Sequence, residues 1–133
     1  LMSKIKVDYL GELRTTSFHI NSKSRIETDA PKDNNGLGRK FSPTDLVASS
    51  LGSCLLTIMG IVGKRHDLDL GNTYANIEKY MSERPRRISR INIDIFFDKR
   101  IDSKNKNLLI RASKHCPVHN SLDKEIEINI NFN

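Results

Sequence analysis

The longest apolar stretch of the chain, at residues 43–63, predicts a helix. Ser42 supplies an N-cap hydroxyl, Pro43 suits the first helical position, and Asp45 follows three residues after the cap. Residues 64–66 are basic, as is common at the C-terminal end of a helix. At about 100° per residue, two apolar stripes form, one of Val47, Leu51, Cys54, Ile58 and Ile61 and the other of Leu55, Met59 and Val62. A helix that is apolar on nearly every side is expected to be surrounded.

Alternating apolar and polar residues predict strands on both sides of this helix. Three strands are expected before it, at residues 4–10, 13–20 and 24–28, and three after it, at 73–81, 87–97 and 125–132. Residues 29–38 are turn formers and predict a surface loop. Residues 101–113 are weakly helical, and a short helix or turn is expected from Cys116, before Pro117. The order βββ-α-ββ-α-β, with hairpins rather than βαβ crossovers, predicts one α+β domain over residues 1–133, mainly of antiparallel sheet.

The central apolar helix is about as long as the shortest membrane span, roughly 17 residues. It carries serines, a threonine and three glycines, and the rest of the chain is polar, which favours the core helix of a soluble protein. Met2 leads directly into the first strand without a signal-peptide pattern, so a cytoplasmic location and no membrane partner are expected. Hydrophobic content is 37% and aromatic content 6%, which is modest for a core around such a helix. A second copy of the chain is therefore expected to cover part of it.

The chain has 22 basic and 16 acidic residues, a net charge of +6. Arg84, Arg86, Arg87 and Arg90 form a cluster that could contact nucleic acid. Because no nucleic-acid recognition motif accompanies the cluster, we interpret it as the solvated start of a strand and expect no nucleic-acid partner.

The two cysteines, Cys54 and Cys116, are the candidate chemical groups. Core packing is the ordinary role of a cysteine in an apolar helix. In a cytosolic protein, however, a pair of thiols is more often catalytic or redox-active. An apolar environment raises the pKa of a thiol, so a reactive Cys54 needs a nearby cation. An arginine suits this role because it keeps its proton. The spacing of residues does not select among the arginines.

Two other chemistries were considered for the segment around Cys116. His115 and His119 are spaced i, i+4, as in some metal sites, but no second ligand pair has a matching spacing. A Cys–His nucleophile for acyl transfer lacks an acid partner and an oxyanion loop. Surface or hydrogen-bonded histidines are therefore the expectation.

Two segments of the chain resemble the signature segments of the OsmC/Ohr family, the osmotically inducible protein C and organic hydroperoxide resistance proteins. One runs from Phe41 to Cys54 and the other from His115 to Leu122, with Cys-Pro at the second cysteine. The resemblance includes residues 11–14 and the Asp29-Ala30-Pro31 loop, and is stronger to the general OsmC-like branch. It implies an intertwined homodimer in which sheets wrap long central helices, with active sites at the subunit interface.

The resemblance also implies a function, a thiol-dependent peroxidase for organic hydroperoxides and, less well, hydrogen peroxide, in oxidative stress defence. Carried over by position, Cys54 is the peroxidatic cysteine, Cys116 the resolving cysteine, and Arg14 the arginine that holds the thiolate. An external dithiol would reduce the resulting disulfide, and no metal or organic cofactor is implied. The alternative is a non-catalytic member of the same fold that binds a small ligand or senses redox state. The physiological peroxide and the reducing partner are not revealed by the sequence.

One position departs from the hydroperoxide resistance branch of the family. There a glutamate directly follows the helix-opening proline and pairs with the arginine, whereas here Thr44 occupies that place and Asp45 comes next. One residue turns a side chain by about 100° around a helix. Asp45 is therefore a candidate both for holding Arg14 and for capping the helix.

Overall fold

The computed structural model describes residues 2–133. The chain divides into two compact units, with the boundary after Leu46. The expectation of a single domain stays a prediction, and each unit is described by itself. The predicted α+β class is confirmed, with two three-stranded sheets and helices.

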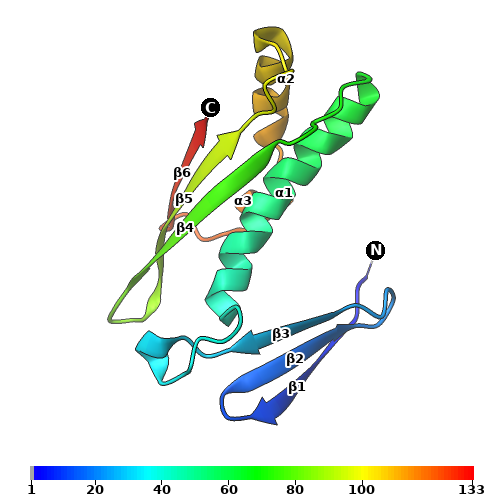
Figure 1. The fold of residues 1–133 in the computed structure, drawn as a ribbon. Helices are drawn as coiled ribbons and strands as arrows, with labels where there is room; N and C mark the ends of the chain where they lie inside the picture. The colour runs from blue at the N-terminus through cyan, green and yellow to red at the C-terminus, as the bar shows by residue number, and fades with distance from the viewer. Residues whose placement is uncertain (1) are drawn as a thin grey trace. The chain divides into compact units, whose positions relative to one another are not determined.

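The N-terminal unit is an antiparallel sheet of β1 (Ile5–Gly11), β2 (Arg14–His19) and β3 (Arg25–Asp29), in that order (Figure 1). All three strands were predicted. The β1–β2 turn has Gly11, Glu12 and Leu13 at positive φ, a region that glycine adopts most readily. A short 3₁₀ helix, η1 (Lys32–Asn34), lies in the loop after β3, where only a loop was expected.

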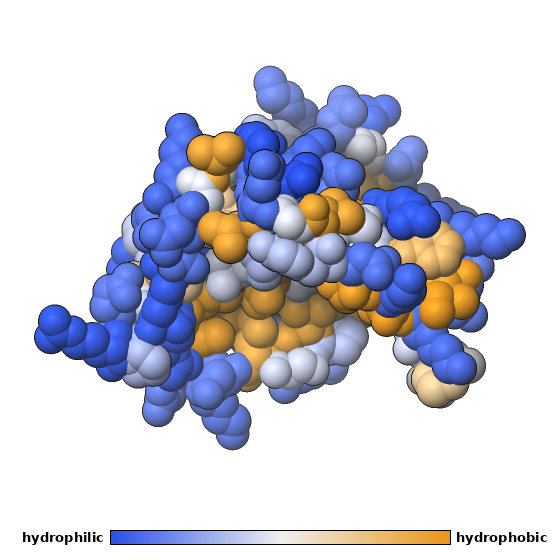
Figure 2. Space-filling model, turned by 90° about the horizontal axis from the view of Figure 1, so that it is seen from below, coloured by the Kyte–Doolittle hydropathy of each residue, from blue (hydrophilic) through white to orange (hydrophobic). Residues whose placement is uncertain are grey.

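Apolar side chains of the N-terminal unit remain at the surface. Ile5, Val7 and Tyr9 alternate along β1, and each is more than half exposed. Leu10, Leu13, Ile20, Ile26, Leu37 and Phe41 are exposed as well. On the face drawn in Figure 2, apolar surface gathers in broad patches between hydrophilic side chains. Strand alternation therefore predicted the strands correctly, but β1 does not bury its apolar side within this chain.

The predicted central helix is confirmed as α1 (Pro43–Arg65). Its buried residues are Ala48, Leu51, Gly52, Leu55, Met59 and Gly63. Within this chain the first predicted stripe is buried only in part, because Cys54 is half-buried and Ile61 is 44% exposed. The buried face includes an alanine and two glycines, which let neighbouring elements approach closely. A prediction based on large apolar residues overlooks these small ones. By length and composition α1 could also cross a membrane, a test that the core helix of a soluble protein passes equally.

The C-terminal unit contains a second sheet, ordered β4 (Tyr74–Ser82), β5 (Arg87–Phe96) and β6 (Glu127–Phe132). β4 and β5 form the predicted antiparallel hairpin. β5 and β6 are parallel, so the expectation of hairpins rather than βαβ crossovers was wrong at this pair. The crossover contains α2 (Ser103–Ser113) and α3 (Pro117–Ser121). Parallel neighbours need such a long connection, because the chain must return to the same end of the sheet.

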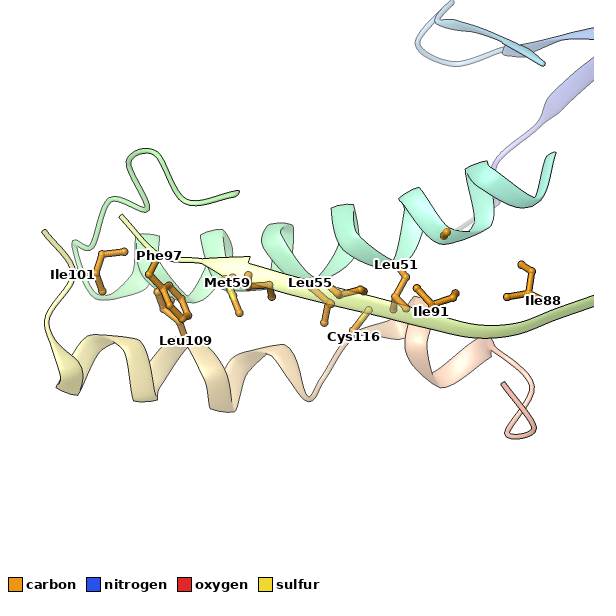
Figure 3. Close-up of a cluster of buried hydrophobic side chains, with 12 residues drawn as sticks. Leu51, Leu55, Met59, Ile88, Ile91, Phe97, Ile101, Leu109 and Cys116 are labelled. Atoms are coloured by element: carbon orange, nitrogen blue, oxygen red, sulfur yellow. The ribbon is translucent and has the colours of Figure 1, made fainter. Parts of the chain in front are cut away.

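The core of the C-terminal unit lies between α1, α2 and one face of this sheet (Figures 1 and 3). Ile91, Ile93 and Ile95 on β5 are fully buried, as their alternation predicted. A register shift opposite Tyr80 and Met81 changes this alternation, and Ile88 is buried as well. From the helices, the fully buried side chains include Leu51, Leu55, Met59 and Leu109. Cys116 is a member of the same cluster.

Candidate active site

Cys54 lies on α1, directly before the fully buried Leu55. Its side chain is half-buried and packs against the hydrophobic core. A thiol in this position has apolar contacts on one side and remains accessible on the other. Cys54 is thus more open than the fully buried Leu55 beside it.

Cys116 is the N-cap residue of α3, and its side chain is fully buried. The backbone N–H of His119 donates a hydrogen bond to Cys116 Sγ, with a distance of 3.4 Å. Pro117 occupies the first helical position, which needs no N–H donor. The sequence Cys-Pro therefore begins the helix, and the N-cap hydrogen bond fixes the orientation of the thiol. Figure 3 shows Cys116 pointing from the start of α3 toward α1.

The two thiols lie side by side, although 62 residues separate them in the sequence. Burial raises the pKa of the Cys116 thiol, and the interaction with Cys54 raises it further. Backbone N–H groups of His119 and Val118 act in the opposite direction, with a smaller effect. Cys116 therefore loses its proton less readily than an ordinary cysteine thiol does.

Arg14 and Asp45 belong to the N-terminal unit and are described within it. Arg14 opens β2, where its Nε donates to the Gly11 carbonyl oxygen at 3.3 Å. Its Nη2 lies 3.9 Å from Glu12 Oε2, a long ion pair with an exposed carboxylate. The guanidinium lines a pocket of about 180 Å³ together with Asp29 and Arg39.

Asp45 forms a reciprocal capping box with Ser42. The Asp45 N–H donates to Ser42 Oγ at 3.1 Å, and the Ser42 N–H donates to Asp45 Oδ2 at 2.9 Å. Two backbone donors at the start of α1 are thereby satisfied. The predicted helix start is confirmed, whereas a role of Asp45 toward Arg14 stays a prediction.

The sequence reasoning did not single out Asp29, which the structure places at the end of β3 with only 1% exposure. Its Oδ2 accepts hydrogen bonds from Arg39 N at 3.0 Å and from Arg39 Nε at 2.8 Å. The Arg39 hydrogen bond holds the pKa of Asp29 below its ordinary value. The sequence placed Asp29 at the start of a polar loop that shares in the family resemblance, without a role of its own, and its position directly after a predicted strand was the available signal.

Most of the arginine cluster is engaged in ion pairs. Arg87 pairs with Glu125 at 2.7 Å, Arg90 with Glu127 at 3.8 Å, and Arg86 with Glu83 at 3.3 Å. The Arg90 guanidinium also lies over the Tyr80 ring. These pairs reduce the local positive charge that nucleic-acid binding would use. Within residues 2–133, no group of three or more histidine, cysteine or acidic side chains has the arrangement of a metal site.

Comparison with known proteins extends this description. Residues 33–131 match the model of the OsmC-like protein family. An uncharacterized protein of Methanocaldococcus jannaschii is 33% identical over 93 residues, which make up 68% of this chain and 49% of that protein. The chain therefore spans about half the length of this curated relative.

Solved structures support the same relationship. A protein of Psychrobacter arcticus 273-4, named for osmotic stress induction and detoxification response, is 41% identical, with a TM-score of 0.93 over 100% of this chain and 97% of that one. An organic hydroperoxide resistance protein from Elizabethkingia anophelis is 15% identical, with a TM-score of 0.76 over 99% of this chain and 95% of that one. At this low identity, the second likeness shows the fold alone. The family match and the shared fold together establish that the chain belongs to the OsmC-like protein family.

Proposed function

We propose that this protein is a thiol-dependent peroxidase that reduces organic hydroperoxides and, less well, hydrogen peroxide, in oxidative stress defence. The observation that carries the proposal is the proximity of the two cysteines: the half-buried Cys54 packs against the hydrophobic cluster that contains the fully buried Cys116. Packing alone does not require two distant cysteines to meet. The family also includes organic hydroperoxide resistance proteins, which supports the same chemistry.

In the first step, the Cys54 thiolate attacks the outer oxygen of the hydroperoxide. The S–O bond forms, the O–O bond breaks, and the leaving alkoxide takes up a proton to become an alcohol. Cys54 is oxidised to a sulfenic acid and the peroxide is reduced by two electrons. The exposed side of Cys54 is where the peroxide would enter.

In the second step, the Cys116 sulfur attacks the Cys54 sulfur. An S–S bond forms, and the sulfenic oxygen leaves as water with the proton from the Cys116 thiol. An external dithiol then reduces the disulfide and returns both cysteines to thiols. Because every electron comes from thiols, the cycle requires no metal or organic cofactor.

Arg14 is assigned the role of the cation that holds the thiolate, on the strength of the family pattern. Asp45 is its candidate acidic partner. We further propose a cytoplasmic homodimer with the active sites at the subunit interface. The exposed apolar side of β1 and the half-exposed apolar residues of α1 support a second copy as their cover.

The test is the consumption of cumene hydroperoxide with a dithiol reductant, using wild type, Cys54→Ser and Cys116→Ser. Cys54→Ser should abolish consumption, because no nucleophilic sulfur remains at the accessible position. Cys116→Ser should retain a single rapid turnover and accumulate a sulfenic acid, detected by mass spectrometry as a dimedone adduct on Cys54. Wild type treated with one equivalent of peroxide should lose two hydrogens, mapped to a Cys54–Cys116 bridge.

Equal consumption by wild type and Cys54→Ser would overturn the proposal. Tolerance of both cysteine replacements, together with a small ligand that raises the melting temperature, would instead identify a non-catalytic binding protein.

A further inference from the structure

The N-terminal unit contains a buried carboxylate with an unused acceptor. Asp29 is 1% exposed, and only its Oδ2 accepts hydrogen bonds from Arg39. Its Oδ1 is buried without a hydrogen-bond partner among the described residues. A buried charged acceptor without a hydrogen bond is unfavourable, so such an atom needs an explanation.

Arg14 is the side chain best placed to supply the missing donor. In the antiparallel pairing of β2 with β3, Arg14 and Asp29 are direct partners. Side chains of such a pair leave the sheet on the same face, with Cβ atoms about 4.5–5.5 Å apart. Both residues line the same pocket of about 180 Å³.

The contacts that Arg14 makes in this structure are weak enough to exchange. Its Nε–Gly11 bond is long at 3.3 Å, and the 3.9 Å pair with Glu12 involves a carboxylate whose side chain is 76% exposed. Exposed ion pairs contribute little to stability because water screens them. A buried carboxylate that is already charged offers a stronger acceptor.

We propose that Asp29 is the positioning residue for Arg14, with Asp29 Oδ1 accepting a guanidinium N–H in the reactive arrangement. The proposal rests on the proposed function, in which Arg14 holds the Cys54 thiolate. A planar guanidinium presents several donors in a fixed fork, so one edge can bind Asp29 while the other edge still has donors for a sulfur or a peroxide oxygen. Arg39 binds the second carboxylate oxygen and keeps Asp29 ionised.

Asp45 fits this role less well than Asp29. Its backbone N–H and one carboxylate oxygen are both used in the capping box with Ser42. Asp29, by contrast, lies opposite Arg14 in the sheet register and shares its pocket. Asp45 stands one residue later than the glutamate of the hydroperoxide resistance branch. Asp29, on the strand next to that of Arg14, would take over the role of that glutamate.

The experiment compares wild type with Asp29→Asn in a two-substrate assay. Asparagine keeps the shape and one oxygen that can still accept from Arg39, but its amide nitrogen cannot accept from Arg14. We expect kcat/KM for cumene hydroperoxide to fall about tenfold to a hundredfold, as misplacement of a catalytic group does. The kcat/KM for the dithiol should stay unchanged, because reduction of the disulfide does not use Arg14. A loss in both half-reactions would mean a merely structural role.

Glu27→Gln is the matched control. Glu27 lies two residues earlier on β3, lines the same pocket and pairs with Lys40 at 3.4 Å, but is opposite Thr16 rather than Arg14. The Glu27→Gln substitution removes one negative charge, as Asp29→Asn does, and should leave both half-reactions at the wild-type rate.

A double-mutant cycle with Arg14→Ala decides whether Asp29 acts through Arg14. In the Arg14→Ala background, Asp29→Asn should have no further effect on kcat/KM for the peroxide, and independent, multiplying losses would overturn the proposal. If Arg14→Ala itself leaves the rate unchanged, the assigned role of Arg14 fails, and if Cys54→Ser remains active, the proposed function fails. A crystal structure of the reduced wild-type protein gives a second readout that needs no variant. Asp29 Oδ1 should lie about 2.7–2.9 Å from an Arg14 nitrogen, and a separation beyond about 4 Å, the limit for an ion pair, would overturn the proposal.

Discussion

At the scale of single residues, the molecule uses buried aspartates to fix the ends of strands. Asp98 follows β5, is 8% exposed and accepts hydrogen bonds from Asn72 N and from the backbone and side chain of Arg100. Gly71 lies so close that a Cβ there would be 2.2 Å from Asp98 Oδ2, and its φ is +56°. A side chain at position 71 would therefore disturb this carboxylate, which joins the segment before β4 to the segment after β5.

The Asp98 contacts predict a specific pH dependence. The Arg100 side chain, with backbone N–H donors, holds the pKa of Asp98 well below its usual range. Because the pKa is lower in the folded than in the unfolded state, the stabilisation is complete above the ordinary carboxyl pKa of about 3.9 and is lost as pH falls below it. Asp98→Asn should lower the melting temperature at pH 7, and the difference from wild type should shrink as pH falls from about 5 to about 3.

Asp8→Asn is the control for this experiment, since the pair that Asp8 forms with Lys6 is exposed. It should leave the melting temperature nearly unchanged at every pH. A constant difference between Asp98→Asn and wild type across the pH range would contradict the assignment.

At the scale of elements, α1 packs on β4 through a glycine. A Cβ at Gly52 would lie 2.2 Å from Ile77 Cδ1 and 3.3 Å from Ile77 Cγ1. Gly52 is buried on the face of α1 that carries Leu51, Leu55 and Met59. The absence of a side chain at Gly52 thus sets how closely α1 and β4 approach at this point.

Two glycines of α1 should respond in opposite ways to alanine. Gly52→Ala should destabilise by ~1–3 kcal/mol through overpacking against Ile77. Gly60→Ala is the matched control, because its Cβ would meet only Leu70 Cδ1 at an ordinary 3.8 Å. It should be neutral or stabilising by up to about 1 kcal/mol, since alanine favours the helix. Urea unfolding measures both, and Gly52→Ala/Ile77→Val should recover part of the loss; equal effects of the two alanines would contradict the packing argument.

The elements themselves could be predicted from local patterns. Alternation predicted the strands, and the Ser42, Pro43 and Asp45 signals predicted the start of α1, because both depend on neighbouring residues. The parallel pairing of β6 with β5 could not be predicted, since register depends on the path of a crossover. The buried face of α1 was predicted only in part, because small residues that permit close packing carry little hydrophobic signal.

The candidate site could be predicted only as a set of residue types. The sequence identified both cysteines, but their contact arises from packing of α3 against α1, which no spacing encodes. Asp29 was missed because the importance of a carboxylate depends on its burial and on the residue opposite it in a sheet. Pairwise relations of this kind appear only when strands are placed in register.

At the scale of the whole molecule, the exposed apolar side chains of β1 require a partner surface. A three-stranded sheet with Ile5, Val7 and Tyr9 more than half exposed would favour association in water. The net charge of +6 and the polar remainder of the chain favour hydration of the rest of the surface. These features agree with the proposed homodimer.

Sedimentation should therefore give a particle of about twice the 15.2 kDa chain mass. Val7→Glu places a charge in the middle of the apolar side of β1 and should shift the protein toward monomer at micromolar concentration. Ser3→Glu, at an exposed residue before β1, is the control and should remain dimeric. A monomeric wild type, or a fully dimeric Val7→Glu, would rule out β1 as the interface.

Because Cys116 is completely buried, its thiol can serve as a probe of local unfolding in the C-terminal unit. A water-soluble alkylating reagent can meet Cys54 on the folded surface, but it reaches a sulfur with zero exposure only while the surrounding helices separate. The alkylation rate of Cys116, compared with that of Cys54, therefore reports how often the C-terminal core opens locally. This readout does not depend on the chemistry that the two cysteines perform.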